Sequence, residues 1–370
     1  PYAVLGSVFQ YEAQALVSDG TLIVCDGQSV YSAPFQPPTA LDISDDVLDL
    51  RITDRQSQES TLTLVLDTFD GAYGPNGDKL PSIQPGASID VSLGYDGTLV
   101  QTHTFFLDTW TYTSVRADST LTLRGRCALR LLDTPSDEVR DADAQSVGAL
   151  VGELAGQVGL EVAALPGTTQ FSEQIGCFSV TAGESWLAAL RRLSAIFGFV
   201  FFADASARLR VVDPQPADAG TWTYGDEVYA YSYAYAADRA NLIQVIGQNP
   251  PLPPGVPPPF TPAPPPFAIS VDNADLAASG RPITRIIVDR LLTSSPQCAL
   301  RAGLALAEEQ RNAYAAEIAT PINPIHEIGD VIAYSSDRLG INQLARIVAL
   351  DWAITPESGT WLQHVHCAGV

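Results

Sequence analysis

The stretch Gly329-Asp330-Val331-Ile332-Ala333-Tyr334 is followed, after a loop, by Leu350-Asp351-Trp352-Ala353-Ile354-Thr355 and then by Thr360-Trp361-Leu362-Gln363-His364-Val365-His366-Cys367-Ala368. The first third of the chain has the same order, as Gly86-Ala87-Ser88-Ile89-Asp90-Val91, Leu107-Asp108-Thr109-Trp110-Thr111-Tyr112-Thr113 and Thr120-Leu121-Thr122-Leu123-Arg124-Gly125-Arg126-Cys127-Ala128. Both copies read as three extended segments joined by turns, which predicts an all-β unit that occurs twice. A chance likeness between two strand-rich stretches is the alternative, and the shared order of Trp, Thr and Cys-Ala favours duplication.

The composition is that of a folded, acidic protein. The 370 residues suffice for about two or three domains, with 46% hydrophobic and 17% charged residues. Asp and Glu outnumber Lys and Arg by 42 to 20, so the formal net charge is −22. Such a surface repels phosphate, which disfavours nucleic-acid binding but suits a wall past which DNA slides without sticking.

The five cysteines lie far apart, without a Cys-x-x-Cys motif, in or beside apolar runs. We therefore expect buried free thiols and no oxidising compartment. The sequence has no run of 18 consecutive apolar residues, so no transmembrane helix is predicted. The first residues do not read as a signal peptide. Because the chain has no methionine, we expect a removed initiator or a processed or partial product.

Periodicity divides the chain into four parts. Residues 1–40 read as an N-terminal β segment of short strands. Residues 41–135 form the first β unit, since Val47–Ile52 and Ser60–Leu66 alternate apolar and polar side chains.

Residues 136–213 read as a small inserted α/β domain. One helix is predicted by apolar residues at i, i+3, i+4, i+7 and i+11 from Val147 to Val158. Thr181-x-x-Glu184 reads as the capping box of a second helix, whose apolar stripe runs from Trp186 to Phe197.

Residues 214–370 return to β structure as the second β unit. The proline-rich residues 249–267 predict an exposed, extended loop, and a helix is expected over 296–316 with Ser295 as its cap. The fold class is therefore mainly β with an α/β insertion.

Four groups of residues are candidate functional sites. Asp67, Asp70 and Asp78 resemble a calcium loop but lack the ligand spacing of an EF-hand, so an Asp- and Gly-rich turn is the better interpretation. His364 and His366 would share one face of a strand near Cys367, but two ligands do not make a metal site.

The two remaining groups are acidic and aromatic. Asp42, Asp45, Asp46 and Asp49 are acidic enough for glycosidase chemistry, yet a solvated loop is the default interpretation. Trp110, Trp352 and Trp361 would stack on sugars if exposed, but their place inside strands favours core packing. No hydrolase, zinc-protease, Walker or dinucleotide motif is present, so we expect no catalytic residue, metal or cofactor.

The order of these parts resembles the baseplate hub (tail tip hub) proteins of tailed bacteriophages, also found in gene transfer agents and contractile injection systems. In the first β unit the likeness rests on strand 61–66, then Asp67-x-x-Asp70-Gly71-x-Tyr73-x-Pro75 and Gln84-Pro85-Gly86-x-x-Ile89-x-Val91. Later it rests on the helix from Val147, Gly183-Glu184-Ser185-Trp186, the strand 209–214, Ala237-Asp238-Arg239-Ala240-Asn241-x-Ile243-x-Val245-x-Gly247, the helix 296–316 and Ile328-Gly329-Asp330-Val331-Ile332. The likeness covers most of residues 41–370.

The resemblance implies a structural protein of the virion tail, assembled in the host cytoplasm. It implies a homotrimer in which each chain supplies two tube-like β barrels, so that a pseudo-sixfold ring joins the tail tube or distal tail protein to a threefold spike or fibre. The tape measure protein is a further candidate partner, and DNA would pass through the ring without specific binding. The alternatives are a tail-associated peptidoglycan-degrading enzyme and a carbohydrate-binding module for host recognition.

Overall fold

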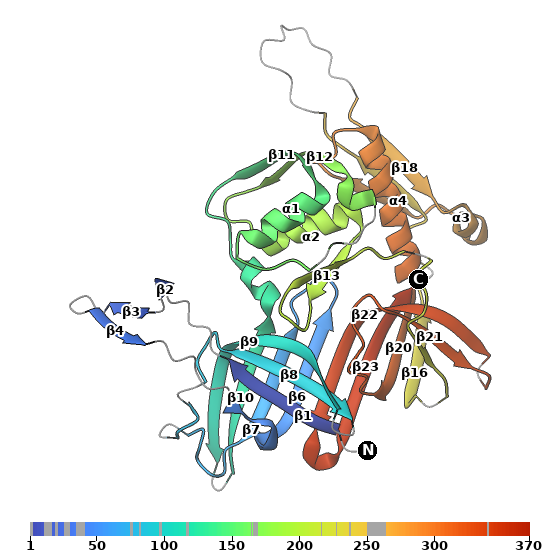
Figure 1. Cartoon of the computed structure of the whole chain (residues 1–370). Coiled ribbons are helices and arrows are strands. Elements are labelled where there is room, and N and C mark those ends of the chain that lie inside the picture. The colour runs from blue at the N-terminus through green and yellow to red at the C-terminus, as the bar shows by residue number, and fades with distance from the viewer. Residues whose placement is uncertain are drawn as a thin grey trace.

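The computed structural model describes residues 3–10, 17–18, 21–25, 30–34 and 41–370, except 75–76, 81–82, 96–97, 116–117, 164, 166–168, 216, 227, 237, 250–263 and 339. A large β-sheet forms one end of the molecule, and the helices lie beyond one end of its strands (Figure 1). Most of the expected proline-rich loop lies outside the described residues. Among those described, no helix is long and apolar enough to cross a membrane.

The large sheet has 13 strands in the order β16-β20-β23-β22-β6-β7-β10-β9-β8-β1-β5, with β21 beside the first half of β22 and β15 beyond β21. The strands are β1 (Ala3–Gln10), β5 (Leu41–Asp42), β6 (Val47–Arg55), β7 (Thr61–Asp67), β8 (Ser88–Tyr95), β9 (Thr98–Val115), β10 (Asp118–Cys127), β15 (Trp222–Tyr224), β16 (Ala230–Tyr235), β20 (Tyr314–Pro321), β21 (Val331–Ser336), β22 (Ile341–Thr355) and β23 (Thr360–Gly369). The mainly β class is confirmed. The described strands form one open sheet rather than two separate closed barrels, because β6 pairs with β22.

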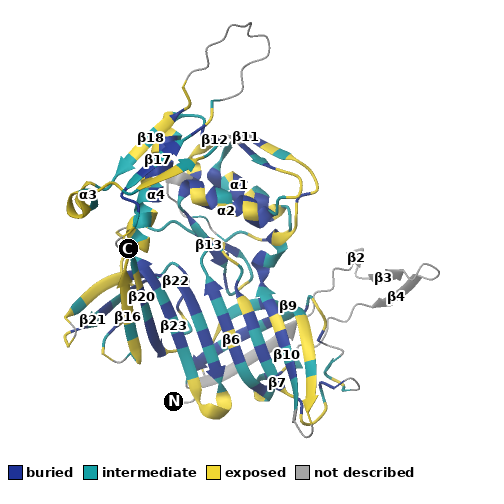
Figure 2. Ribbon diagram, turned by 180° about the vertical axis from the view of Figure 1, so that it is seen from behind, coloured by how far each residue is buried: buried dark blue, intermediate teal, exposed yellow. Residues whose placement is uncertain are grey.

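Alternation along the strands places the hydrophobic core on one face of this sheet. In β7, Leu62, Leu64 and Leu66 are buried, whereas Thr61 and Asp67 are exposed. The bands of buried and more exposed residues across the central strands show the same period of two (Figure 2). The period-2 prediction for these strands is therefore confirmed.

The first insertion contains β11 (Arg140–Ser146), α1 (Val147–Gly156), β12 (Gln174–Val180), α2 (Trp186–Phe197), β13 (Val200–Ala203) and β14 (Leu209–Val212). The expected cap of α2 was wrong by four residues: Ser185 is the N-cap, and its Oγ accepts a hydrogen bond from the Ala188 amide at 3.2 Å. Glu184 accepts from the Thr181 amide at 3.1 Å, as a capping-box glutamate would, but in the turn before the helix. The stripe of α2 is buried as predicted, and that of α1 is buried from Val147 to Leu154, whereas Val158 lies beyond the end of α1 and is only partly buried.

A second insertion separates β16 from β20. It contains β17 (Leu242–Ile246), β18 (Phe267–Val271), α3 (Asn273–Ser279), β19 (Thr284–Val288) and α4 (Ser295–Asn312). The helix expected over 296–316 ends earlier, because the residues from Tyr314 onward form β20, which pairs with β16 and β23. Its N-cap is Ser294 rather than Ser295.

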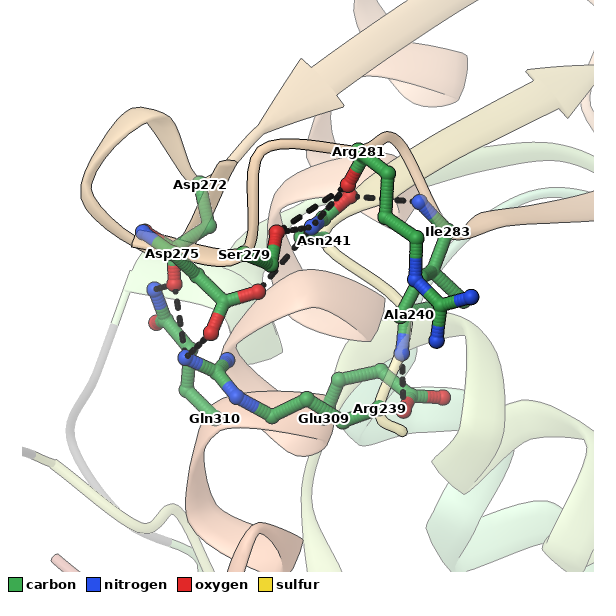
Figure 3. A network of polar contacts seen from close by, with 10 residues as sticks. All are labelled: Arg239, Ala240, Asn241, Asp272, Asp275, Ser279, Arg281, Ile283, Glu309 and Gln310. Atoms are coloured by element: carbon green, nitrogen blue, oxygen red, sulfur yellow. Dashed lines mark hydrogen bonds and ion pairs between the residues drawn. The ribbon is translucent and has the colours of Figure 1, made fainter. Parts of the chain in front are cut away.

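Asn241, from the motif 237–247, holds this insertion together (Figure 3). Its side chain is fully buried; Oδ1 accepts from the Ile283 amide at 2.8 Å, and Nδ2 donates to the Arg281 carbonyl at 3.1 Å and Asp275 Oδ2 at 3.0 Å. Arg239 forms ion pairs with Asp272 and Asp275 at 3.1 and 3.3 Å. A buried amide with every bond made specifies one arrangement of β17, α3 and the loop before β19.

The two β units have the same strand order. The first is β6-β7-β10-β9-β8, and the second is β16-β20-β23-β22-β21. The order of the three quoted segments therefore corresponds to two matching meanders, β8-β9-β10 and β21-β22-β23.

The register of the duplication differs from the one that the sequence likeness indicated. Gly86 donates to the Leu107 carbonyl at 2.7 Å and Gly329 to the Ile347 carbonyl at 2.9 Å, and both glycines have positive φ, +92° and +95°. Leu107 is therefore equivalent to Ile347, not to Leu350. A bulge follows in each copy, after Leu107 in β9 and after Ile347 in β22. The repeated Leu-Asp and Cys-Ala letters thus lie at non-equivalent positions.

Candidate assembly interface

The two β units meet at a joint between β6 and the second half of β22. The strands are antiparallel, with Leu350 opposite Asp54, Trp352 opposite Ile52 and Ile354 opposite Leu50. These side chains point into the core, and none is more than 6% exposed. The joint therefore continues the sheet and the core from one unit into the other.

The opposite face of the joint is polar. Arg55 Nη2 lies 2.9 Å from Asp351 Oδ2, and Thr355 donates to Asp49 Oδ1 at 3.0 Å. Burial alone would raise the pKa of Asp351, but hydrogen bonds from Arg55, His366 and Thr53 outweigh it and hold this pKa below its ordinary value. The ion pair thus adds an electrostatic link between the two units.

In the first unit, β9 is the strand equivalent to β22. Among the described strands, none pairs with the edge of β9 that corresponds to the joint. Residues 98–106 pair with β8 and residues 105–115 pair with β10. The other edge of residues 109–115 is unpaired among the described strands. Along it, Trp110 is 37% and Val115 is 62% exposed.

The strand equivalent to β6 in the second unit, β16, also has a free edge. It pairs with β20 and ends the sheet. Tyr233 and Tyr235 are 60% and 61% exposed, and Tyr231 stacks on Tyr334 with ring centroids 4.1 Å apart. The two free edges thus lie at opposite sides of the sheet (Figure 1).

Neither free edge carries a device against pairing. Residues 109–115 read Thr-Trp-Thr-Tyr-Thr-Ser-Val and residues 230–235 read Ala-Tyr-Ser-Tyr-Ala-Tyr, with no charge and no proline. Monomeric proteins usually block exposed edges with Lys, Pro or bulges, because unpaired N–H and C=O groups recruit another strand. These two edges are therefore candidates for contact with another chain.

The sequence missed this site, although one signal was present. The alternation of tyrosines with small residues from Tyr229 to Tyr235 predicts a strand, but nothing in it distinguishes an edge strand from a central one. The absence of charge from both segments, in a chain with 17% charged residues, could have marked them.

The carboxylates weighed as a calcium loop serve local turns. Asp67 Oδ1 accepts from the Phe69 amide at 3.0 Å, and Asp70 Oδ1 accepts from the Ala72 amide at 2.9 Å. Among the described residues, no group of three or more His, Cys, Asp or Glu side chains could hold a metal ion. The interpretation as a turn is confirmed.

The two C-terminal histidines each face an acidic neighbour on the polar face of the sheet. His364 Nδ1 lies 2.8 Å from Glu317 Oε1, and His366 Nε2 lies 2.8 Å from Asp351 Oδ2. Cys367 points to the other face and is buried. The structure thus separates the cysteine from the histidines.

The four carboxylates of the acidic cluster lie just before β6 and, for Asp49, within it, and three of them have different partners. Asp42 accepts from Ser44, Asp46 lies 2.7 Å from the Lys79 ammonium, and Asp49 pairs with Arg51 at 3.0 Å.

The three tryptophans have different environments. Trp352 is 2% exposed and Trp361 is half-buried, as core packing predicts. The prediction of core packing is wrong for Trp110, which is 37% exposed because no described strand lies along the edge beside it.

No family model matches this sequence, and no curated protein matches it. Solved structures do match. A 43 kDa tail protein of prophage MuSo2 from Shewanella oneidensis has a TM-score of 0.66 at 15% identity and covers 99% of this chain and 98% of its own. A tail protein from Neisseria meningitidis MC58 also has a TM-score of 0.66, at 11% identity, over 100% of this chain and 97% of its own. The chain has the fold of these phage tail proteins. The E. coli c3393 protein, a type VI secretion component described as similar to the T4 tail proteins gp27 and gp5, has a TM-score of 0.54 at 13% identity over 88% of this chain and 74% of its own.

This shared fold confirms the resemblance to phage tail proteins that the sequence motifs indicated. It extends across the whole chain, including both β units and both insertions.

Proposed function

We propose that this protein is a structural, non-enzymatic hub of a virion tail, assembled as a homotrimer in which the free edge of β9 in one chain pairs with the free edge of β16 in the next. The observation that carries the proposal is the in-chain joint, because it is a template for the same contact between chains. Three copies joined in this way form a closed ring of six similar β units.

The duplication predicts the register of this contact. Ile52 and Tyr233 occupy equivalent positions, since each lies opposite equivalent residues of β7 and β20, and Trp352 is equivalent to Tyr112 by the same reasoning. The pair Trp352–Ile52 in the joint thus becomes Tyr112–Tyr233 between chains. The neighbouring pairs are Thr109–Ala236, Trp110–Tyr235, Thr111–Ala234, Thr113–Ser232 and Ser114–Tyr231.

The side chains of these pairs are compatible on both faces. On the core face, Trp110 and Tyr112 meet Tyr235 and Tyr233, and aromatic cross-strand pairs stabilise sheets by about 0.2–1 kcal/mol each. On the polar face all partners are small. The ion pair of the in-chain joint is absent there, because Thr111 stands at the position equivalent to Asp351.

The polar face of the central strands is the proposed wall of the DNA channel. Its acidic groups are largely matched by basic partners, as in Arg55–Asp351 at 2.9 Å and His364–Glu317 at 2.8 Å. Where a carboxylate lies against a guanidinium in this way, that cation is less available to hold phosphate, which favours passage of DNA without sticking. The ring would contact the tail tube or distal tail protein on one side and a spike or fibre on the other.

A double cysteine variant tests the edge pairing. Thr111→Cys with Ala234→Cys places two thiols directly opposite each other on the polar face, at a Cα separation of about 4.5–5.5 Å that a disulfide tolerates. Oxidation should give a covalent trimer on non-reducing gels. The native thiols of Cys127, Cys298 and Cys367 are buried. The other two native cysteines, Cys25 and Cys177, are replaced by serine in this variant and in its control, so that they contribute no background.

The matched control is Thr109→Cys with Ser232→Cys, on the same strands and face but four positions out of register. This control should stay monomeric on the same gel. A trimer in solution without cross-linking by either pair would contradict the edge pairing. A wild type that is monomeric at all concentrations would contradict the homotrimer itself.

A further inference from the structure

A cavity of about 230 Å³ lies where α2 and α4 approach the first unit's β6–β7 turn and strands β22 and β23. Four arginines line it: Arg191 from α2, Arg301 and Arg311 from α4, and Arg346 from β22. Glu308 is the acidic side chain in this lining. In a chain with 42 acidic and 20 basic residues, this concentration of positive charge in one cavity requires a physical reason.

Arg301 is the side chain that most clearly suits this cavity to an anion. It is 8% exposed, and its Nε makes no hydrogen bond. Among the described residues, no carboxylate lies within ion-pair distance of Arg301 or Arg311. A buried guanidinium without a partner is costly, because it loses its hydration without compensation.

The electrostatics of the cavity agree with this geometry. Burial lowers the pKa of both Arg301 and Arg311, and the negative charge of Glu308 opposes this shift without cancelling it. The nearby charge of Arg346 lowers the pKa of Arg311 further. Both shifts mean that the environment disfavours the positive charge. A bound anion would relieve this penalty at both side chains.

The other two arginines are held in place by the fold. Arg191 Nε donates to the Ser57 carbonyl at 2.9 Å. Arg346 donates through Nη1 to the Gly329 carbonyl at 2.8 Å and through Nη2 to Asp218 at 2.8 Å, while its Nε has no partner. These contacts fix the positions of both side chains, so little side-chain entropy is lost when a ligand binds to their remaining N–H groups.

We propose that this cavity binds a small multivalent oxyanion, one that carries carboxylate or phosphate groups. Guanidinium groups recognise both through paired N–H···O bonds. The cavity is larger than one water molecule needs, and the acidic balance of the rest of the chain opposes a long polyanion. The site is independent of the proposed hub function, because it lies away from both free strand edges.

Isothermal titration calorimetry of the full chain tests the proposal, with inorganic phosphate and citrate as separate probes and chloride at equal ionic strength as the reference. Saturable binding of about one phosphate or citrate per chain is expected. The probe that binds more tightly identifies the ligand as a phosphate or a carboxylate anion. Arg301→Gln and Arg311→Gln should each weaken binding about tenfold or more, since a charge-assisted bond is lost.

The matched control is Arg51→Gln, because the Arg51 side chain is 70% exposed on the sheet and far from the cavity; it should bind as the wild type does. Arg301→Met adds a readout that a purely structural role would not produce. Without added anion its melting temperature should equal or exceed that of the wild type, and a given anion concentration should raise it less than it raises that of the wild type. No saturable binding by the wild type, or unchanged affinity in both glutamine variants, would overturn the proposal. So would a lower melting temperature of Arg301→Met without added anion.

Discussion

Replacing Tyr233 by Ala should prevent assembly at concentrations where the wild-type chain forms trimers. Complete burial of a large apolar side chain stabilises by about 1.5–3 kcal/mol. Because Tyr233 is 60% exposed in the single chain, roughly 1–2 kcal/mol of that remains to be gained on pairing, and the aromatic pair with Tyr112 adds up to about 1 kcal/mol. We therefore expect a loss of about 2 kcal/mol at each contact.

The ring amplifies this loss. Three equivalent contacts lose about 6 kcal/mol together, which lowers the trimer association constant by about four orders of magnitude. Assembly of three chains depends on the square of the free chain concentration at half-saturation, so the midpoint should rise about a hundredfold. Sedimentation velocity or mass photometry over a dilution series measures this midpoint.

Tyr229→Ala is the control, because Tyr229 is 67% exposed but lies just outside β16 and beyond the proposed register. Its midpoint should match the wild type. The reasoning is refuted if Tyr233→Ala assembles at wild-type concentrations, or if both variants shift equally. An unchanged melting temperature of the dilute, unassembled chain would show that the change acts on assembly.

Three further predictions concern the single chain. Asn241→Ala should lower the free energy of unfolding by about 2–3 kcal/mol, because it removes the hydrogen bonds of a fully buried amide with the Ile283 amide, the Arg281 carbonyl and Asp275. Urea denaturation measures the change, with the exposed Asn342→Ala as control. Asp351 has a pKa held below that of an unfolded aspartate, so its stabilising effect is present above about pH 4 and is lost as the pH falls further. The difference in stability between the wild type and Asp351→Asn should therefore narrow in acid. Melting curves over a range of pH measure this difference, and a constant difference across that range would contradict the prediction. Burial raises the pKa of the Cys127 thiol to about 11 and that of Cys367 to about 12, so neither should react with a thiol reagent at pH 8 until the chain is unfolded. Peptide mass spectrometry assigns the label among the five cysteines, and rapid labelling at Cys127 or Cys367 in the native chain would contradict this.

Several features were predictable because they depend on local periodicity. Alternating residues such as Leu62 and Thr63 marked strands with one buried face, and the stripes of α1 and α2 marked helices. The end of α4 was not predictable in this way: the Ala-rich residues after Asn312 favour a helix by propensity, but backbone pairing with β16 and β23 outweighs that preference.

The candidate interface and the arginine-lined cavity depend on contacts between residues far apart in the sequence, so they could not be predicted from local patterns. Trp110 and Trp352 look like equivalent residues of a repeat, but the bulges in β9 and β22 make Tyr112 the equivalent of Trp352. Trp352 lies in the joint because β6 pairs with β22, whereas no described strand pairs with the edge beside Trp110. Arg301 and Arg346 likewise lie 45 positions apart in sequence and line the same cavity only in the folded chain.

The sequence by itself determined that two similar β meanders exist, since alternation and turns are local properties of the chain. The tertiary structure alone decided that these units share one sheet, that β6 is paired while its equivalent β16 is free, and that β22 is paired while the matching part of β9 is free. The physical reason is that a strand's hydrogen-bonding edge is satisfied by whichever strand lies beside it, and that neighbour is chosen by long-range packing rather than by the strand's own residues.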